Sequence, residues 1–224
     1  LRCRGQVTPG ARTLEYEVFV EEFIAGPIPM LKADLLCTVD GLKAFHCKGM
    51  KLRLAPSWPL QSRAMLTDGI ELKTQQHIAR GADIEFDFYS LAACAWGQPS
   101  HGFGKMYSVY DSERRCPRLP GPPYHFISRV TKLEAKTPNK KPGGYVEVEY
   151  DVPPDAWYFA ENGRRVMPYC VLLEAALQPC GWLASYIGCA LGTDEDVYFR
   201  NLDGTSPPHE EITPRSGTLK TTVK

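Results

Sequence analysis

RVMPYCVLLEAALQPCGWLASYIG, residues 165–188, carries the strongest structural signal in this chain of 224 residues. Its apolar side chains recur at helical spacing, at Met167, Val171, Ala175 and Trp182. Pro168 suits the first turn of such a helix, where its missing N–H is not needed. The predicted helix is apolar on nearly every side, so we expect it to be buried over most of its surface.

Glu174 is the one carboxylate in this segment, and charged side chains are seldom buried without compensation. Gln178 lies four residues further on, on the same face, within hydrogen-bonding reach. Pro179 cannot donate to the carbonyl of Ala175, so it is expected to bend the helix. Burial would raise the pKa of the carboxyl towards neutrality, which suits a general acid. The alternative is a structural glutamate that Gln178 and a neighbouring segment hold in place.

Alternating patterns predict antiparallel strands before the helix. Apolar side chains in residues 14–20 alternate with glutamates, which is typical of a strand with one solvated face. Apolar runs over 31–39 and 42–54 flank Asp40-Gly41, a strong hairpin signal. Residues 145–150 alternate cleanly and predict the strand before the helix. Strands of this kind around one long helix define an α+β fold class.

A weak internal repeat predicts two units in the chain. Gln-Val-Thr-Pro at 6–9 recurs as Glu-Ile-Thr-Pro at 211–214, with similar residues following at the same offset. We therefore expect residues 1–55 to be the late strands of a first unit. Residues 120–224 would be the early strands and central helix of a second unit. Each block would expose apolar surface that the other covers, so we expect the two blocks to pack together.

Between these blocks, residues 56–119 are rich in proline and predict a partly structured linker. A connection of this length is unusual for an unstructured loop, so part of it is expected to pack on the sheet. Within it, residues 83–89 alternate acidic and aromatic side chains. That pattern indicates a short strand or a segment that covers a groove, and favours helix less.

The composition excludes several classes of function. Basic and acidic residues number 26 each and are interspersed, so nothing favours binding to nucleic acid or to an anionic membrane. No apolar run is long enough to span a membrane, and the first residues lack the apolar core of a signal peptide. The 8 cysteines show no C-x-x-C pair, which indicates reduced, buried thiols in a cytoplasmic protein. Cys170 and Cys180 are accordingly predicted to be small core residues.

No metal or cofactor is expected, because no histidine or cysteine pair has ligand spacing and no phosphate-binding loop appears. Lys136, Lys140 and Lys141 form a basic cluster that indicates a solvated turn. The alternative is a docking patch for an acidic acyl carrier protein. His125, between two aromatic residues, is the least ordinary of the 5 histidines, and we expect it to be structural.

The central helix resembles that of a known family at Val166-Met167-Pro168, Cys170, the acid at 174, Gln178 and Gly181. The family is that of the bacterial 3-hydroxyacyl-ACP dehydratases, and the dehydratase region of polyunsaturated fatty acid synthases is more similar still. The resemblance implies the hot-dog fold, an antiparallel sheet wrapped around a long helix. It also implies a paired assembly, in which a histidine of one hot-dog meets the helix acid of the other.

This resemblance assigns the residues of a site. Glu174 would be the catalytic acid, with Gln178 beside it. Backbone amides near Tyr169 and Cys170 would polarise the thioester oxygen of an acyl-ACP substrate. The other partners implied are further hot-dog units of the synthase or a dimer mate.

The chain departs from the family where the catalytic histidine is expected. The segment before the Met-Pro pair, residues 157–162, reads WYFAEN and contains no histidine. The chain is therefore interpreted as a fragment of a dehydratase region, inactive alone, whose histidine lies upstream of Leu1. The activity implied is removal of water from 3-hydroxyacyl thioesters to give enoyl thioesters. The alternatives are a non-catalytic hot-dog that supports an active neighbour, or a thioesterase of the same fold.

Overall fold

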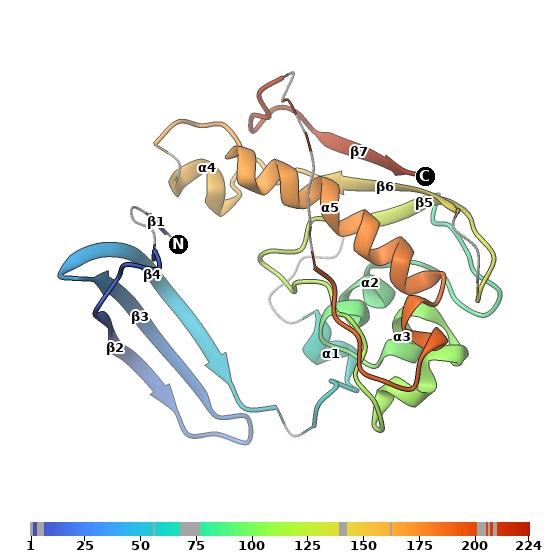
Figure 1. Ribbon diagram of the computed structural model, residues 1–224, viewed down its shortest axis with the longest axis horizontal. Helices are drawn as coiled ribbons and strands as arrows, with labels where there is room; N and C mark the ends of the chain where they lie inside the picture. Colours follow the sequence, from blue (N-terminus) through green and yellow to red (C-terminus); the bar gives the residue numbers. More distant parts are fainter. Residues whose placement is uncertain are drawn as a thin grey trace. The chain divides into compact units, whose positions relative to one another are not determined.

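The chain divides into two compact units in a computed structural model, Leu1–Pro56 (unit 1) and Ser57–Lys224 (unit 2), which are described separately (Figure 1). The structure describes residues 2–3, 7–55, 57–67, 77–138, 143–161, 163–200, 205, 207 and 210–224. Gln6, Lys140 and Lys141, which carried part of the predicted repeat and basic cluster, lie outside these residues.

Unit 1 is a four-stranded antiparallel sheet in the order β1-β4-β3-β2. The strands are β1 (Arg2–Cys3), β2 (Leu14–Ile24), β3 (Met30–Val39) and β4 (Leu42–Arg53). The predicted hairpin is present, since Asp40 and Gly41 both adopt positive φ, of 49° and 78°, between β3 and β4. A two-residue turn of this kind matches the twist of the strands that it joins. The Asp40 carboxylate also accepts a hydrogen bond from Thr13 N at 2.8 Å.

The prediction of one covered face on the first strand is wrong for β2, because every residue of β2 is exposed. The exposed residues include Val18, Val20 and Phe23, the last with 66% of its surface accessible. The described residues of unit 1 form strands and turns only, so this unit supplies no second layer for β2. Among its described side chains, Ala33 and Cys37 of β3 and Ala44 of β4 are buried.

Unit 2 places a long helix against a three-stranded antiparallel sheet in the order β5-β6-β7 (Figure 1). The strands are β5 (Arg129–Glu134), β6 (Tyr145–Asp151) and β7 (Thr218–Val223). The helices are α1 (Arg63–Leu66), α2 (Phe88–Ala95), α3 (Pro99–Phe103), η1 (Lys105–Asp111), α4 (Trp157–Glu161), α5 (Tyr169–Tyr186) and η2 (Cys189–Gly192). Helix α5 and strand β6 confirm the predicted helix and the strand before it. No helix among the described residues is long and apolar enough to cross a bilayer.

The main core of unit 2 forms where α5 meets the sheet and the segment that contains α2. Trp182 is fully buried, stacks on Tyr186 with ring centroids 5.4 Å apart, and receives the edge of Phe86 at 4.9 Å. Val130 and Val146 complete this cluster from the sheet. Aromatic pairs in these arrangements stabilise a core beyond the area that they bury.

The segment from Ser57 to Leu119 thus belongs to unit 2, and the boundary follows Pro56. Residues 83–89 form no extended strand, because an isolated bridge joins Arg80 to Glu85 and α2 begins at Phe88. The Asp87 side chain caps α2 by accepting a hydrogen bond from Ser90 N at 2.9 Å. This local cap overrides the alternating pattern.

Candidate functional site

Helix α5 presents Cys170, Glu174 and Gln178 at intervals of four residues, so they lie along one face. Gln178 is 3% exposed, Glu174 is half-buried and Cys170 is exposed. The face therefore runs from solvent at the helix start to the interior two turns later.

Gln178 joins this helix to the extended segment that precedes β5. Its Nε2 donates to the carbonyl of Tyr124 at 2.8 Å and to Glu174 Oε1 at 3.1 Å. Its Oε1 accepts a hydrogen bond from Phe126 N at 2.7 Å. Both amide hydrogens and the carbonyl oxygen are therefore used, and the predicted contact between Gln178 and Glu174 is present. The orientation of the Glu174 carboxylate is set by a side chain that is itself fixed.

Tyr124 lies beside the same carboxylate, and the sequence analysis did not assign it to the site. Burial raises the pKa of the Tyr124 phenol, and the negative charge of the nearby Glu174 carboxylate raises it further. The phenol therefore stays protonated at neutral pH and is a hydrogen-bond donor at the site. Only the fold brings Tyr124 next to Glu174, because no motif links residues fifty positions apart.

The predicted oxyanion donors, the amides of Tyr169 and Cys170, lie in the first turn of α5. Pro168 is the N-cap residue, and its carbonyl accepts hydrogen bonds from Val171 N at 3.0 Å and Leu172 N at 3.1 Å. The backbone N–H groups of a first helical turn lie at the positive end of the helix dipole. This geometry is compatible with polarising a thioester oxygen.

Two expectations about α5 are wrong. Glu174 is half-buried rather than enclosed, and its neighbours Leu173 and Leu177 are only partly buried. Cys170 and Cys180 were predicted to be core residues and are exposed. The reason is that the described part of unit 2 covers chiefly the faces of α5 that carry residues such as Val171, Ala175 and Trp182.

Aromatic side chains fill the segment that the resemblance associates with a histidine. In α4, Tyr158 and Phe159 are buried, and the Tyr158 hydroxyl lies 3.1 Å from that of Tyr150. Trp157 Nε1 donates to the carbonyl of Pro123 at 3.3 Å, and its ring centroid lies 6.3 Å from that of Tyr124. Asn162 lies outside the described residues. These contacts hold α4 against the segment that Gln178 binds.

His125 lies within that segment and is buried. Its Nδ1 lies 3.0 Å from the carbonyl oxygen of Pro120. Burial lowers the pKa of the imidazole, although the carbonyls of Pro120 and Ile127 partly oppose this effect. At neutral pH the ring is therefore uncharged.

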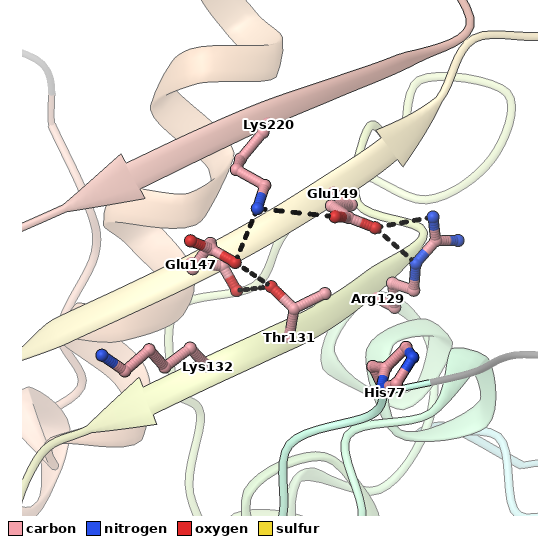
Figure 2. Close-up of a pocket in the computed structure, with 7 residues that line it drawn as sticks. All are labelled: His77, Arg129, Thr131, Lys132, Glu147, Glu149 and Lys220. Atoms are coloured by element: carbon pink, nitrogen blue, oxygen red, sulfur yellow. Dashed lines mark hydrogen bonds and ion pairs between the residues drawn. The ribbon is translucent and has the colours of Figure 1, made fainter.

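A recess of about 620 Å³ is lined mainly by side chains of β5, β6 and β7 (Figure 2). Because side chains alternate along a strand, Glu147 and Glu149 of β6 point outwards while Val146 and Val148 point into the core. Lys220 Nζ lies 3.0 Å from Glu147 Oε1, and Arg129 Nη2 lies 2.7 Å from Glu149 Oε2 (Figure 2). Within this recess the two glutamates are therefore paired with Lys220 and Arg129.

The contacts of Glu147 with Thr131 and Lys220 predict how its pKa changes when one of them is removed. A hydrogen bond from Thr131 and the charge of Lys220 hold the pKa of Glu147 below its usual range. This depression stabilises the fold above the unfolded-state pKa, and the contribution is lost as the pH falls through the folded-state pKa. In Lys220→Met we expect the pKa of Glu147 to rise, as measured by NMR titration of its carboxyl carbon. Lys132→Met is the matched control with a smaller effect, and an unchanged pKa in Lys220→Met would contradict the pairing.

Among the residues that the structure describes, no group of three or more His, Cys, Asp or Glu side chains is arranged to hold a metal ion.

A long helix packed on an antiparallel sheet gives unit 2 an α+β architecture, with Glu174 on the helix. A model of the FabA-like domain matches residues 1–48 and 119–224, more than half of the chain. The chain belongs to the FabA-like domain family, whose members are hot-dog dehydratases. The match includes all of α5, Tyr124 and the sheet of unit 2, and omits residues 49–118.

Proposed function

We propose that this chain forms part of the dehydratase region of a polyunsaturated fatty acid synthase, in the cytoplasm. Its substrate would be a 3-hydroxyacyl thioester on an acyl carrier protein, and its product an enoyl thioester. Family membership supports a dehydratase or isomerase type of function in general. Within that family, the sequence motif from Val166 to Gly181 is more similar to the dehydratase region of polyunsaturated fatty acid synthases than to the bacterial dehydratases.

In this proposal the reaction breaks a C–H bond at the α carbon and a C–O bond at the β carbon. Glu174 protonates the departing hydroxyl, which leaves as water. A histidine from another hot-dog takes the α proton, because residues 157–162 contain none. The amides of Tyr169 and Cys170 stabilise negative charge on the thioester oxygen. The two C–C electrons of the new double bond come from the broken C–H bond.

The observation that supports this proposal most directly is the fixed geometry of the Glu174–Gln178 pair. Gln178 is held by Tyr124 and Phe126 and donates its remaining hydrogen to Glu174 Oε1 at 3.1 Å. The other oxygen of the carboxyl is then oriented for its substrate, and restricting a reacting group in this way lowers the barrier. Gln178 takes part in the catalytic pair by positioning the acid.

We also propose the domain organisation that the sequence indicates. Residues 1–55 would be the late strands of one hot-dog, and residues 120–224 the early strands and helix of the next. The family match in two segments, 1–48 and 119–224, supports this division. The exposed apolar residues of β2 support it too, since hot-dog sheets bury such residues against a helix.

A second candidate function is that of a non-catalytic hot-dog that supports the fold of an active neighbour. The aromatic packing of α4 favours it, because Trp157, Tyr158 and Phe159 occupy the segment where a histidine is expected. In this alternative Gln178 has a structural role only, and Glu174 meets no substrate.

A dehydratase and a thioesterase differ in the product that they form from a 3-hydroxyacyl thioester. We expect no turnover by this chain alone and enoyl formation, followed by ultraviolet absorption, by the synthase region that contains a histidine-bearing hot-dog. Free thiol is assayed in the same reaction. Enoyl formation by the isolated chain would overturn the assignment of the base to another hot-dog. Release of thiol without enoyl product would indicate a thioesterase instead.

A further inference from the structure

Unit 2 contains a cavity of about 730 Å³ on the side of η1 and the segment that follows it. Its volume falls within the range that is typical of sites for small molecules. The lining side chains that carry the argument are three arginines and three aromatic residues, Arg114, Arg115, Arg118, Trp58, Tyr198 and Phe199.

No carboxylate lines this cavity, although three guanidinium groups do. The Arg118 guanidinium donates to the carbonyls of Ala93 and Gly97, at 3.2 Å to the former. Its partial burial lowers its pKa, and it makes no ion pair with any residue that the structure describes. An arginine still keeps its charge at neutral pH, and a partly buried cation of this kind favours an anion as its partner.

The other two arginines are similarly available. Arg114 donates from Nη2 to the carbonyl of Glu195 at 2.7 Å, while its Nε is buried with no acceptor among the described residues. Arg115 uses its backbone N–H to bind Asp196 Oδ1 at 3.1 Å, and its guanidinium makes no ion pair with a described residue. The cavity therefore concentrates positive charge.

Two acidic side chains, Asp111 and Asp196, lie near these arginines. The Asp111 carboxylate accepts hydrogen bonds from the hydroxyl of Ser100 at 2.6 Å and from its backbone N–H at 3.0 Å. Asp196 accepts the hydrogen bond from the backbone of Arg115. Neither carboxylate lines the cavity, although the charge of Asp111 acts on Arg118 and partly opposes the fall in its pKa.

Aromatic rings line the same cavity and are accessible to a ligand. Trp58 is 64% exposed, Tyr198 is 74% exposed and Phe199 is 42% exposed. The Arg118 guanidinium carbon lies 5.6 Å from the centroid of the Trp58 ring, so cation and ring face one space. Large aromatic side chains gathered at an open cavity are uncommon on a protein surface unless they bind something.

We propose that this cavity binds a nucleoside phosphate, either as a free nucleotide or as the nucleotide end of coenzyme A. Guanidinium groups bind phosphate oxygens through paired, charge-assisted hydrogen bonds. Exposed aromatic rings stack on bases of any sequence. A ligand that carries both an anionic group and a flat ring can contact the arginines and the aromatic residues of this lining at once, whereas a simple anion or a neutral ring can use only one of the two. The site is separate from the Glu174–Gln178 pair and does not depend on the proposed function.

The test measures binding of ADP and of coenzyme A to the 224-residue chain by isothermal titration calorimetry. We expect saturable binding of at least one, with Kd raised about tenfold or more in Arg115→Ala and in Trp58→Ala, as expected for loss of a phosphate contact or a stacking contact. Both side chains are exposed, so the folded state should survive, and circular dichroism checks this. Arg80→Ala, an exposed arginine paired with Glu85 away from the cavity, is the matched control.

The two sources of the ligand are separated by comparing affinities. Equal affinity shows that the cavity recognises only the nucleotide that both ligands share. Tighter binding of ADP assigns a free nucleotide, and affinity for coenzyme A at least tenfold higher assigns the coenzyme. Inorganic pyrophosphate and adenosine, titrated separately, should each bind more weakly than ADP, since each supplies half of the contacts. The proposal is overturned if neither ligand binds at millimolar concentration. It is also overturned if Arg115→Ala and Trp58→Ala bind as the control does.

Discussion

Replacing Glu174 with glutamine is expected to lower the rate of 3-hydroxyacyl dehydration in the synthase by about a hundredfold or more, the usual contribution of a general acid. Glutamine keeps the size of the side chain and can still meet the Gln178 amide, now 3.1 Å from the carboxylate oxygen. It has no proton of suitable pKa to give to a departing hydroxyl. The loss should therefore appear in kcat, measured as enoyl product formed per unit time.

Glu174→Asp provides a second measurement at the same position. Aspartate retains the acid but withdraws it by about a bond length, so activity should fall less than in Glu174→Gln. The free energy of unfolding must be measured for each variant, because unfolding would imitate lost catalysis. A folded Glu174→Gln protein that turns over at the parental rate would show that this hot-dog is a structural partner only.

Replacing Gln178 with leucine is expected to destabilise unit 2 by about 3 kcal/mol, since each buried polar group left without a partner costs about 1–3 kcal/mol. Leucine of similar size removes the acceptor for Phe126 N and the donor to the carbonyl of Tyr124. Both backbone groups belong to a segment that the amide of Gln178 holds to α5, and the side chain is only 3% exposed.

Urea unfolding followed by circular dichroism measures this change. Cys180→Ala, two residues away on the same helix and exposed, is the control, and it should alter the free energy of unfolding by no more than about 0.5 kcal/mol. If Gln178→Leu destabilises the protein by less than 1 kcal/mol, the segment at 124–126 must be held by other contacts, and the positioning role of Gln178 would lose its basis.

Much of the local structure was predictable from short-range signals. Pro168 and the apolar spacing after it predicted helix α5, and Asp40-Gly41 predicted the β3–β4 turn, where both residues adopt positive φ. The alternation over 145–150 predicted β6. The contact between Glu174 and Gln178 was predictable for the same reason, because residues four apart on a helix are always neighbours. These features depend on backbone geometry over a few residues.

Long-range contacts determined the remaining features, and no local pattern encodes them. Gln178 finds its partners Tyr124 and Phe126 more than fifty positions away, where packing of α5 on the sheet brings an extended segment past the helix. Residues 83–89 alternate like a strand but form none, because Asp87 caps helix α2 and Phe86 packs on Trp182. Tertiary folding also decides which faces of α5 are covered by neighbouring segments. Cys170 and Cys180 are exposed because they lie on faces that are not covered. The arginine-lined cavity likewise draws its side chains from three distant segments, so its charge becomes visible only when the chain is folded.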